Sequence, residues 1–169
     1  MARKILALME AGRHAGCMDQ IDRSLLNELQ QDADRSLDDL GDLVGLSASA
    51  VQRRISRMKA DGTITRVVAE VDPIKVGLPV TIVTTVRFER DGYDHTRDLI
   101  DKLQARPEVQ MLQMVTGQYD LLIVSVVGDL ADYSAGVLVD IEGEPNVSRI
   151  ETNVSLWSIK STKALPVLG

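Results

Sequence analysis

The stretch Ser36–Arg66, SLDDLGDLVGLSASAVQRRISRMKADGTITR, predicts the fold of the first part of the chain. Its apolar residues recur at helical spacing on both sides of Gly45, a residue that suits the left-handed conformation ending a helix. Ser36 and Ser47 precede the two expected helices as N-caps. The second helix has no acidic residue and four basic ones, Arg53, Arg54, Arg57 and Lys59. This pattern predicts a helix-turn-helix that binds DNA.

A further helix is expected before this pair, from the cap at Asp19 to about Gln31, because Ile21, Leu25, Leu26 and Leu29 recur at helical spacing. In the two later helices the predicted buried stripes consist of Leu37, Leu40, Leu43 and Val44, and of Val51, Ile55 and Met58. Gly62 ends the last helix. Weak alternation over residues 64–71 then predicts a strand that leads out of the domain.

The charge of the chain is unevenly distributed. The formal net charge is −6, yet residues 1–66 carry 10 basic and 10 acidic side chains, whereas residues 67–169 carry 9 and 15. An acidic surface repels a phosphate backbone. Only the first part of the chain is therefore expected to bind nucleic acid.

The second part shows the alternation of a mixed domain. Strands are predicted over 80–88, 109–115, 121–127 and 147–156, and helices over 94–106 and 129–141. The resulting order β-α-β-β-α-β is that of a ferredoxin-like fold, whose helices cover one face of an antiparallel sheet. Because no further segment remains to cover the other face, a homodimer packed sheet on sheet is expected.

The predicted fold class is α+β, with a winged-type helix-turn-helix domain followed by a ferredoxin-like βαββαβ domain. We expect a mobile extension over residues 1–17, the DNA-binding domain over 18–66, a linker strand over 67–79 and the ferredoxin-like domain over 80–169. No stretch approaches the ~20 apolar residues of a membrane span, so no membrane partner and a cytoplasmic location are expected.

The outward face of the basic helix separates into two groups. With the apolar stripe turned inward, a helical wheel places Ser49, Gln52 and Arg53 near the N-terminal turn, where recognition helices contact base edges. A second group is expected to contact phosphates: Ser47, Arg54, Arg57 and Lys59. The alternative interpretation is a charged face that is merely solvated.

The chain also resembles a known family. DQIDRSLLNELQ (residues 19–30), VGLS (44–47), GTI (62–64) and VTGQYD (115–120) closely resemble segments of the Lrp/AsnC family of transcriptional regulators. The resemblance extends from residue 19 to about 162. It implies an N-terminal DNA-binding domain and a C-terminal effector-responsive domain. It also implies dimers that commonly assemble into octamers and small effectors, usually amino acids, bound between dimers.

Carried over by position, the resemblance implies an effector site formed by one turn and by Thr152 of an adjacent subunit. The residues of that turn are Thr116, Gly117, Gln118, Tyr119 and Asp120. Backbone N–H groups would bind a carboxylate, and Asp120 would accept from an α-ammonium. Gln118 stands where some relatives carry an acidic residue, so their ligand preference does not transfer. The alternative is a plain turn in which Asp120 is a local cap.

Enzymatic alternatives have little support in the sequence. Proteins of the same two-domain fold act as sirohaem decarboxylases, a role that needs histidine and arginine in the C-terminal pocket. That region has only His95 and scattered arginines. His14 and Cys17 are isolated as well, so no metal and no cofactor are expected. Trp157 is expected to pack rather than to stack on a ligand.

Overall fold

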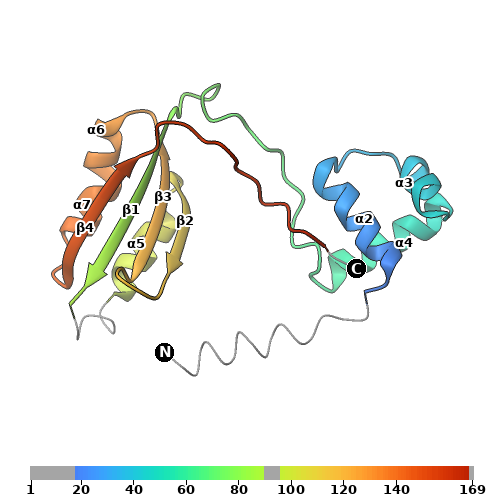
Figure 1. Ribbon diagram of the computed structural model, residues 1–169, viewed down its shortest axis with the longest axis horizontal. Coiled ribbons are helices and arrows are strands. Elements are labelled where there is room, and N and C mark those ends of the chain that lie inside the picture. Colours follow the sequence, from blue (N-terminus) through green and yellow to red (C-terminus); the bar gives the residue numbers. More distant parts are fainter. Residues whose placement is uncertain (1–17, 90–95, 168–169) are drawn as a thin grey trace. The chain divides into compact units, whose positions relative to one another are not determined.

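The computed structural model describes residues 18–89 and 96–167, which form two compact units (Figure 1). The first unit contains the described residues up to Ala69 together with those from Ser161 onward, and the second is Glu70–Lys160. The predicted extension over residues 1–17 and His95 lie outside the described residues. Within the described ranges, no helix has the length and apolar character needed to cross a membrane.

Three helices make up most of the first unit: α2 (Gln20–Gln31), α3 (Leu37–Val44) and α4 (Ala48–Ala60). Each has the N-cap expected from the sequence, since the side chains of Asp19, Ser36 and Ser47 accept from backbone N–H groups of the first turn. Gly45 follows α3 with a φ of 69°, a left-handed conformation that favours glycine. The predicted helix-turn-helix is therefore confirmed.

The core of this unit contains the residues that helical spacing selected, with one exception. Leu25, Leu40 and Val51 are fully buried, but Leu43 is 50% exposed. Two successive steps of three residues from Leu37 drift by about 60° each around a helix, so Leu43 lies at the rim of the apolar stripe.

The predicted strand over 64–71 is wrong. Residues 65–72 have no regular secondary structure, and Val67, Val68 and Val71 are all more than half exposed. A strand is held by hydrogen bonds to a neighbouring strand. No described segment supplies that neighbour in the single chain, because the sheet contains only the four strands of the second unit.

The second unit has the predicted order of elements. It comprises β1 (Val80–Phe88), α5 (Arg97–Ala105), β2 (Val109–Met114), β3 (Leu121–Val127), a helical segment and β4 (Val147–Val154). The strands form an antiparallel sheet in the order β2-β3-β1-β4, with the helices on one face (Figure 1). The predicted βαββαβ topology is therefore confirmed.

The two faces of this sheet differ in burial. Ile82 and Val86 of β1 and Ile123 of β3 are completely buried beneath the helices. On the opposite face, alternate residues of the same strands remain only half-buried, and these include Val83 and Val124. This second face, which also carries Thr85 and Glu151, is thus only half-buried by the described residues, as expected for a sheet whose helices lie on one side.

The second helical segment is divided by a π turn. It runs as α6 (Leu130–Tyr133), η2 (Ser134–Leu138) and α7 (Val139–Glu142). Tyr133, Val137 and Ile141 are at most 2% exposed although they are four residues apart. In a regular α-helix each step of four overshoots a full turn by about 40°, and the wider π turn reduces this drift. Beyond β4, the predicted packing of Trp157 is not observed in the single chain, where the side chain is 71% exposed.

The end of the chain belongs to the first unit, not to the predicted domain over 80–169. Asn27 and Gln30 of α2 form hydrogen bonds with the backbone of Val167 and Leu165. Val167 also packs against the core of the three helices. These contacts explain why the residues from Ser161 onward group with the first unit.

Candidate functional site

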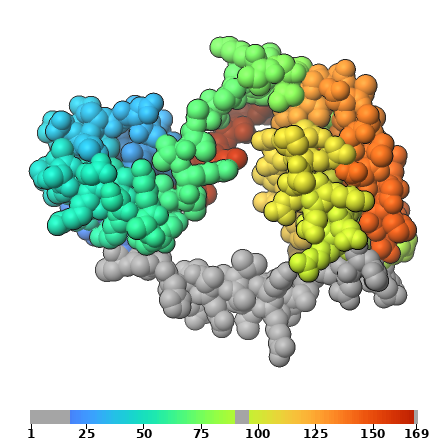
Figure 2. Space-filling view, turned by 180° about the vertical axis from the view of Figure 1, so that it is seen from behind, coloured from blue at the N-terminus to red at the C-terminus, as the bar shows by residue number. Residues whose placement is uncertain are grey.

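The outward face of α4 presents the residues that the helical wheel selected. Ser49, Gln52 and Arg53 are exposed near its N-terminal end, and α4 forms part of the visible surface of the first unit in Figure 2. The Ser47 hydroxyl accepts from the Ala50 N–H at 3.4 Å and lies 3.1 Å from the Ser49 hydroxyl. The first turn of α4 is therefore fixed, while its polar side chains remain accessible.

A buried carboxylate beneath α4 was not predicted. Asp22 of α2 is 1% exposed, and its two oxygens accept from Arg54 at 2.8 Å and from Arg57 at 2.5 Å. Arg54 also donates to Asp19 at 2.7 Å. Asp22 is also the third residue of α2 and completes a capping box with Asp19, and this box was the only local sequence signal for it.

These ion pairs affect the groups that form them. The Asp22 backbone N–H, followed by the Arg54 guanidinium, holds the pKa of the Asp19 carboxyl below its ordinary value. Hydrogen bonds to Asp22 and Asp19 raise the pKa of Arg54 further above its already high value. Hydrogen bonding to the charged form is the physical cause in both residues. The ion pairs thus give Arg54 and Arg57 a structural role besides the predicted phosphate contacts.

Positive charge remains accessible on α4. Arg53 and Lys59 are exposed and form no ion pair with any other described residue. Arg53, Arg54 and Arg57 together line a surface hollow of about 290 Å³. Because the planar guanidinium group matches phosphate oxygens in pairs, three such groups around one hollow suit a polyanion backbone.

The turn that joins β2 to β3 contains the predicted effector residues. Thr116, Gly117 and Gln118 are exposed, and their N–H groups form no hydrogen bond with other described residues. Gly117 has a φ of 127°, in the region that favours glycine. Three backbone donors on an exposed turn have the chemistry needed to hold a carboxylate.

Asp120 already forms hydrogen bonds within its own chain. One carboxylate oxygen accepts from the Phe88 N–H at 2.9 Å, and the Asp120 N–H donates to the Val86 carbonyl at 2.9 Å. Asp120 is therefore a local cap, as in the alternative interpretation of this turn. Its other carboxylate oxygen has no hydrogen bond to another described residue.

Thr152 and Tyr119 do not meet within one chain. The Thr152 hydroxyl lies 3.0 Å from the Tyr133 hydroxyl, which in turn lies 2.8 Å from that of Thr84. The Tyr119 hydroxyl instead donates to Glu151, and this hydrogen bond raises the pKa of Tyr119 above its ordinary value. The family resemblance instead implies a contact between the turn and Thr152 of a second subunit.

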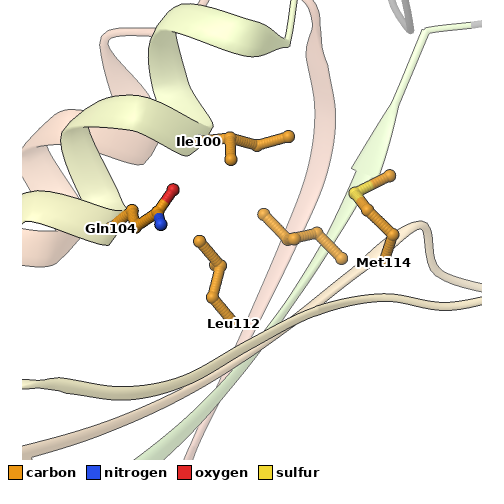
Figure 3. Close-up of a pocket in the computed structure, with 5 residues that line it drawn as sticks. Ile100, Gln104, Leu112 and Met114 are labelled. Carbon is orange, nitrogen blue, oxygen red and sulfur yellow. The ribbon is translucent and has the colours of Figure 1, made fainter. Parts of the chain in front are cut away.

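An apolar hollow adjoins this turn. It has a volume of about 250 Å³ and lies between α5 and the ends of β2 and β3, where Met114 and Leu121 flank the turn (Figure 3). The hollow is lined by Ile100, Gln104, Leu112, Met114 and Leu121. Gln104 is the only polar side chain among these five residues.

Comparison with known families finds a match in each part of the chain. Residues 18–59 match the AsnC-type helix-turn-helix domain, and residues 81–165 match the Lrp/AsnC ligand binding domain. The chain belongs to the Lrp/AsnC family. It is therefore a transcriptional regulator with a helix-turn-helix and a ligand-binding domain, and the decarboxylase alternative is set aside because the family consists of DNA-binding regulators rather than enzymes.

Individual Lrp/AsnC relatives match over nearly the whole chain. The DNA-binding transcriptional activator DecR of Escherichia coli is 29% identical, covering 89% of this chain and 99% of that protein. The structure of an AsnC family transcriptional regulator from Agrobacterium tumefaciens is 33% identical, with a TM-score of 0.81, and covers 89% and 97% of the two chains. A transcriptional regulator of Neisseria meningitidis, solved in complex with L-Met, is 26% identical, with a TM-score of 0.81 over 88% and 96%.

Metal binding has no support in the described part of this Lrp/AsnC protein. No group of three or more histidine, cysteine, aspartate or glutamate side chains there is arranged to hold a metal ion. The Arg106 cluster contains two carboxylates, but both are engaged by that arginine, at 2.6 Å for Asp140 and 3.0 Å for Glu108. The cluster is a structural ion-pair network.

Proposed function

We propose that this Lrp/AsnC protein binds specific double-stranded DNA and that an amino acid modulates its DNA affinity or its assembly. The observation that carries the proposal is the exposed N-terminal end of α4, with Ser49, Gln52 and Arg53 pointing away from the helical core. Arginine pairs with guanine and glutamine with adenine in the major groove. These three residues are assigned to base edges.

Phosphate contacts are assigned to Ser47, Arg54, Arg57 and Lys59. Arg57 is 52% exposed in its side chain despite its bond to Asp22, so several of its donors still reach solvent. The Arg54 side chain is only 22% exposed and donates to two carboxylates. Arg57 and Lys59 are therefore expected to contribute more to phosphate binding than Arg54.

The proposed base reading is tested with the duplex that lies upstream of the protein's own gene. Replacing Arg53 with alanine is expected to weaken binding by about tenfold, because one bidentate base contact is lost. Fluorescence anisotropy titrations at several salt concentrations measure this change. Arg97→Ala is the matched control, since it removes an exposed arginine from α5 in the other unit. Equal affinities for the two variants would contradict the assignment of α4.

The proposed effector is an amino acid with an apolar side chain. The donors of residues 116–118 suit its carboxylate, and the free oxygen of Asp120 suits its ammonium group. The adjoining hollow of about 250 Å³ suits the side chain. The Neisseria meningitidis relative in complex with L-Met supports this choice. Thr152 of an adjacent subunit and the rest of the turn, including Tyr119, are assigned to the same site.

A thermal-shift titration with L-methionine tests this site. At 100 times its dissociation constant, a ligand stabilises the folded state by about 2.7 kcal/mol. Asp120→Asn keeps an acceptor for the Phe88 N–H but removes the charge, so we expect a much smaller shift. Asp101→Asn, which changes an exposed carboxylate on α5, is the control. Equal shifts for both variants would exclude Asp120 as the ammonium partner.

Self-assembly belongs to the same proposal. The half-buried face of the sheet opposite the helices is assigned to a homodimer packed sheet on sheet, with further assembly up to an octamer. Such symmetric assemblies present paired recognition helices to half-sites about one helical turn of DNA, or a multiple of it, apart. A cytoplasmic location completes the proposal.

A further inference from the structure

The C-terminal segment forms a specific contact with the first helix of the DNA-binding unit. We call residues 161–167 the C-terminal strap. The side-chain amide of Gln30 accepts from the Leu165 N–H at 2.7 Å and donates to the Leu165 carbonyl at 3.0 Å. One amide group thus satisfies both backbone groups of one residue, much as a neighbouring strand would.

A second contact on the same face of α2 extends this arrangement. Asn27 lies three residues before Gln30, so both side chains project from one side of the helix. Its amide donates to the Val167 carbonyl at 3.1 Å, and Val167 packs against the apolar core of the unit. Pro166, between the two contacted residues, has no N–H that would need a partner.

The strap nevertheless has few of the features of a permanent core element. The described residues from Ser161 to Pro166 are all exposed, Leu165 by 71%, and only Val167 is half-buried. Such a segment, held mainly by exposed hydrogen bonds and one apolar side chain, opens at low free-energy cost.

The chain passes between the two units twice. The first unit leads into the second through residues near Ala69, and the chain returns to the first unit after Lys160. We propose that the C-terminal strap docks reversibly on Asn27 and Gln30 and thereby adds a second connection between the two units. The consequence for DNA rests on the proposed function: the second connection restricts the orientations of the DNA-binding unit.

Hydrogen–deuterium exchange of the strap tests the docking in the full-length protein. Gln30→Ala removes both bonds to Leu165 and keeps a good helix former on α2. Gln31→Ala is the matched control, because Gln31 is the next residue on α2, is exposed and has no bond to the strap. We expect the Leu165 amide to exchange roughly tenfold faster in Gln30→Ala than in the parent or in Gln31→Ala. Equal exchange in all three proteins would overturn the docking.

Affinity for the upstream duplex tests the coupling. A unit with fewer accessible orientations loses less freedom on association, so Gln30→Ala and a chain ending at Ser161 are expected to bind about tenfold more weakly. The salt dependence should remain that of the parent, since the phosphate contacts of α4 are intact. If Gln30→Ala releases the strap but binds the duplex as tightly as the parent, the proposed second connection does not affect DNA binding and the proposal is overturned. If the parent itself does not bind the duplex, the proposed function fails, whereas exchange still decides the docking.

Discussion

Replacing Asp22 with alanine is expected to destabilise the DNA-binding unit by about 2–3 kcal/mol. The carboxylate is 1% exposed and holds Arg54 and Arg57 of α4 against α2. Its loss removes two charge-assisted hydrogen bonds and leaves both arginines without their buried partner. The partial exposure of those arginines, 22% and 52%, lets water compensate in part, which keeps the loss below that of a fully buried pair. Urea unfolding followed by circular dichroism measures the change.

Asp42→Ala is the control for this experiment. Asp42 is an exposed carboxylate on α3 of the same unit and has no ion pair with another described residue. Its replacement should change the free energy of unfolding by no more than about 0.5 kcal/mol. Similar losses in both variants would mean that the Asp22 ion pairs contribute little. A third variant, Asp22→Asn, retains the shape and is expected to recover part of the loss.

Replacing Gly41 with alanine is expected to cost about 2–3 kcal/mol and to displace α4 from α3. A Cβ atom at this position would lie 2.5 Å from the Leu46 carbonyl oxygen and 3.6 Å from the Ala48 nitrogen. These are backbone atoms of the turn, and the Leu46 N–H donates to the Gly41 carbonyl at 2.9 Å. The clash therefore has no flexible side chain to absorb it. Unfolding free energy and affinity for the upstream duplex should both fall.

Gly45→Ala separates packing from backbone conformation in the same turn. A Cβ at Gly45 meets nothing within 4 Å, but the φ of 69° is unfavourable for alanine by about 1 kcal/mol. We therefore expect Gly41→Ala to be the more destabilising variant. If Gly45→Ala lowers the free energy of unfolding by as much as Gly41→Ala or by more, the expected clash between a Cβ at Gly41 and the turn is contradicted.

The elements that could be predicted from the sequence are those with local signals. The caps at Asp19, Ser36 and Ser47 and the glycine turn at Gly45 depend on neighbouring residues only. The order of strands and helices in the second unit followed from the periodicity of apolar residues. The exposed face of α4 followed from the same periodicity, because a buried stripe at Val51 and Ile55 fixes the opposite side.

The features that could not be predicted depend on residues far apart in the chain. Asp22 is separated from Arg54 by 32 positions and Gln30 from Leu165 by 135, and no local pattern pairs them. The Gln30 contact binds backbone atoms, so the sequence of the strap carries no complementary signal. The strand expected over 64–71 failed for the opposite reason. Its local pattern was suitable, but pairing requires a second strand that the described chain does not provide.

The return of the chain end to α2 means that the DNA-binding unit is encoded in two separate parts of the gene. Residues up to Ala69 and residues from Ser161 onward belong to one folded body, with the ligand-binding unit inserted between them. A single recombination event within the linker would join the three helices to a foreign C-terminal end. Chimaeric regulators built from this protein should therefore exchange the inner segment alone and keep both outer segments from the same parent.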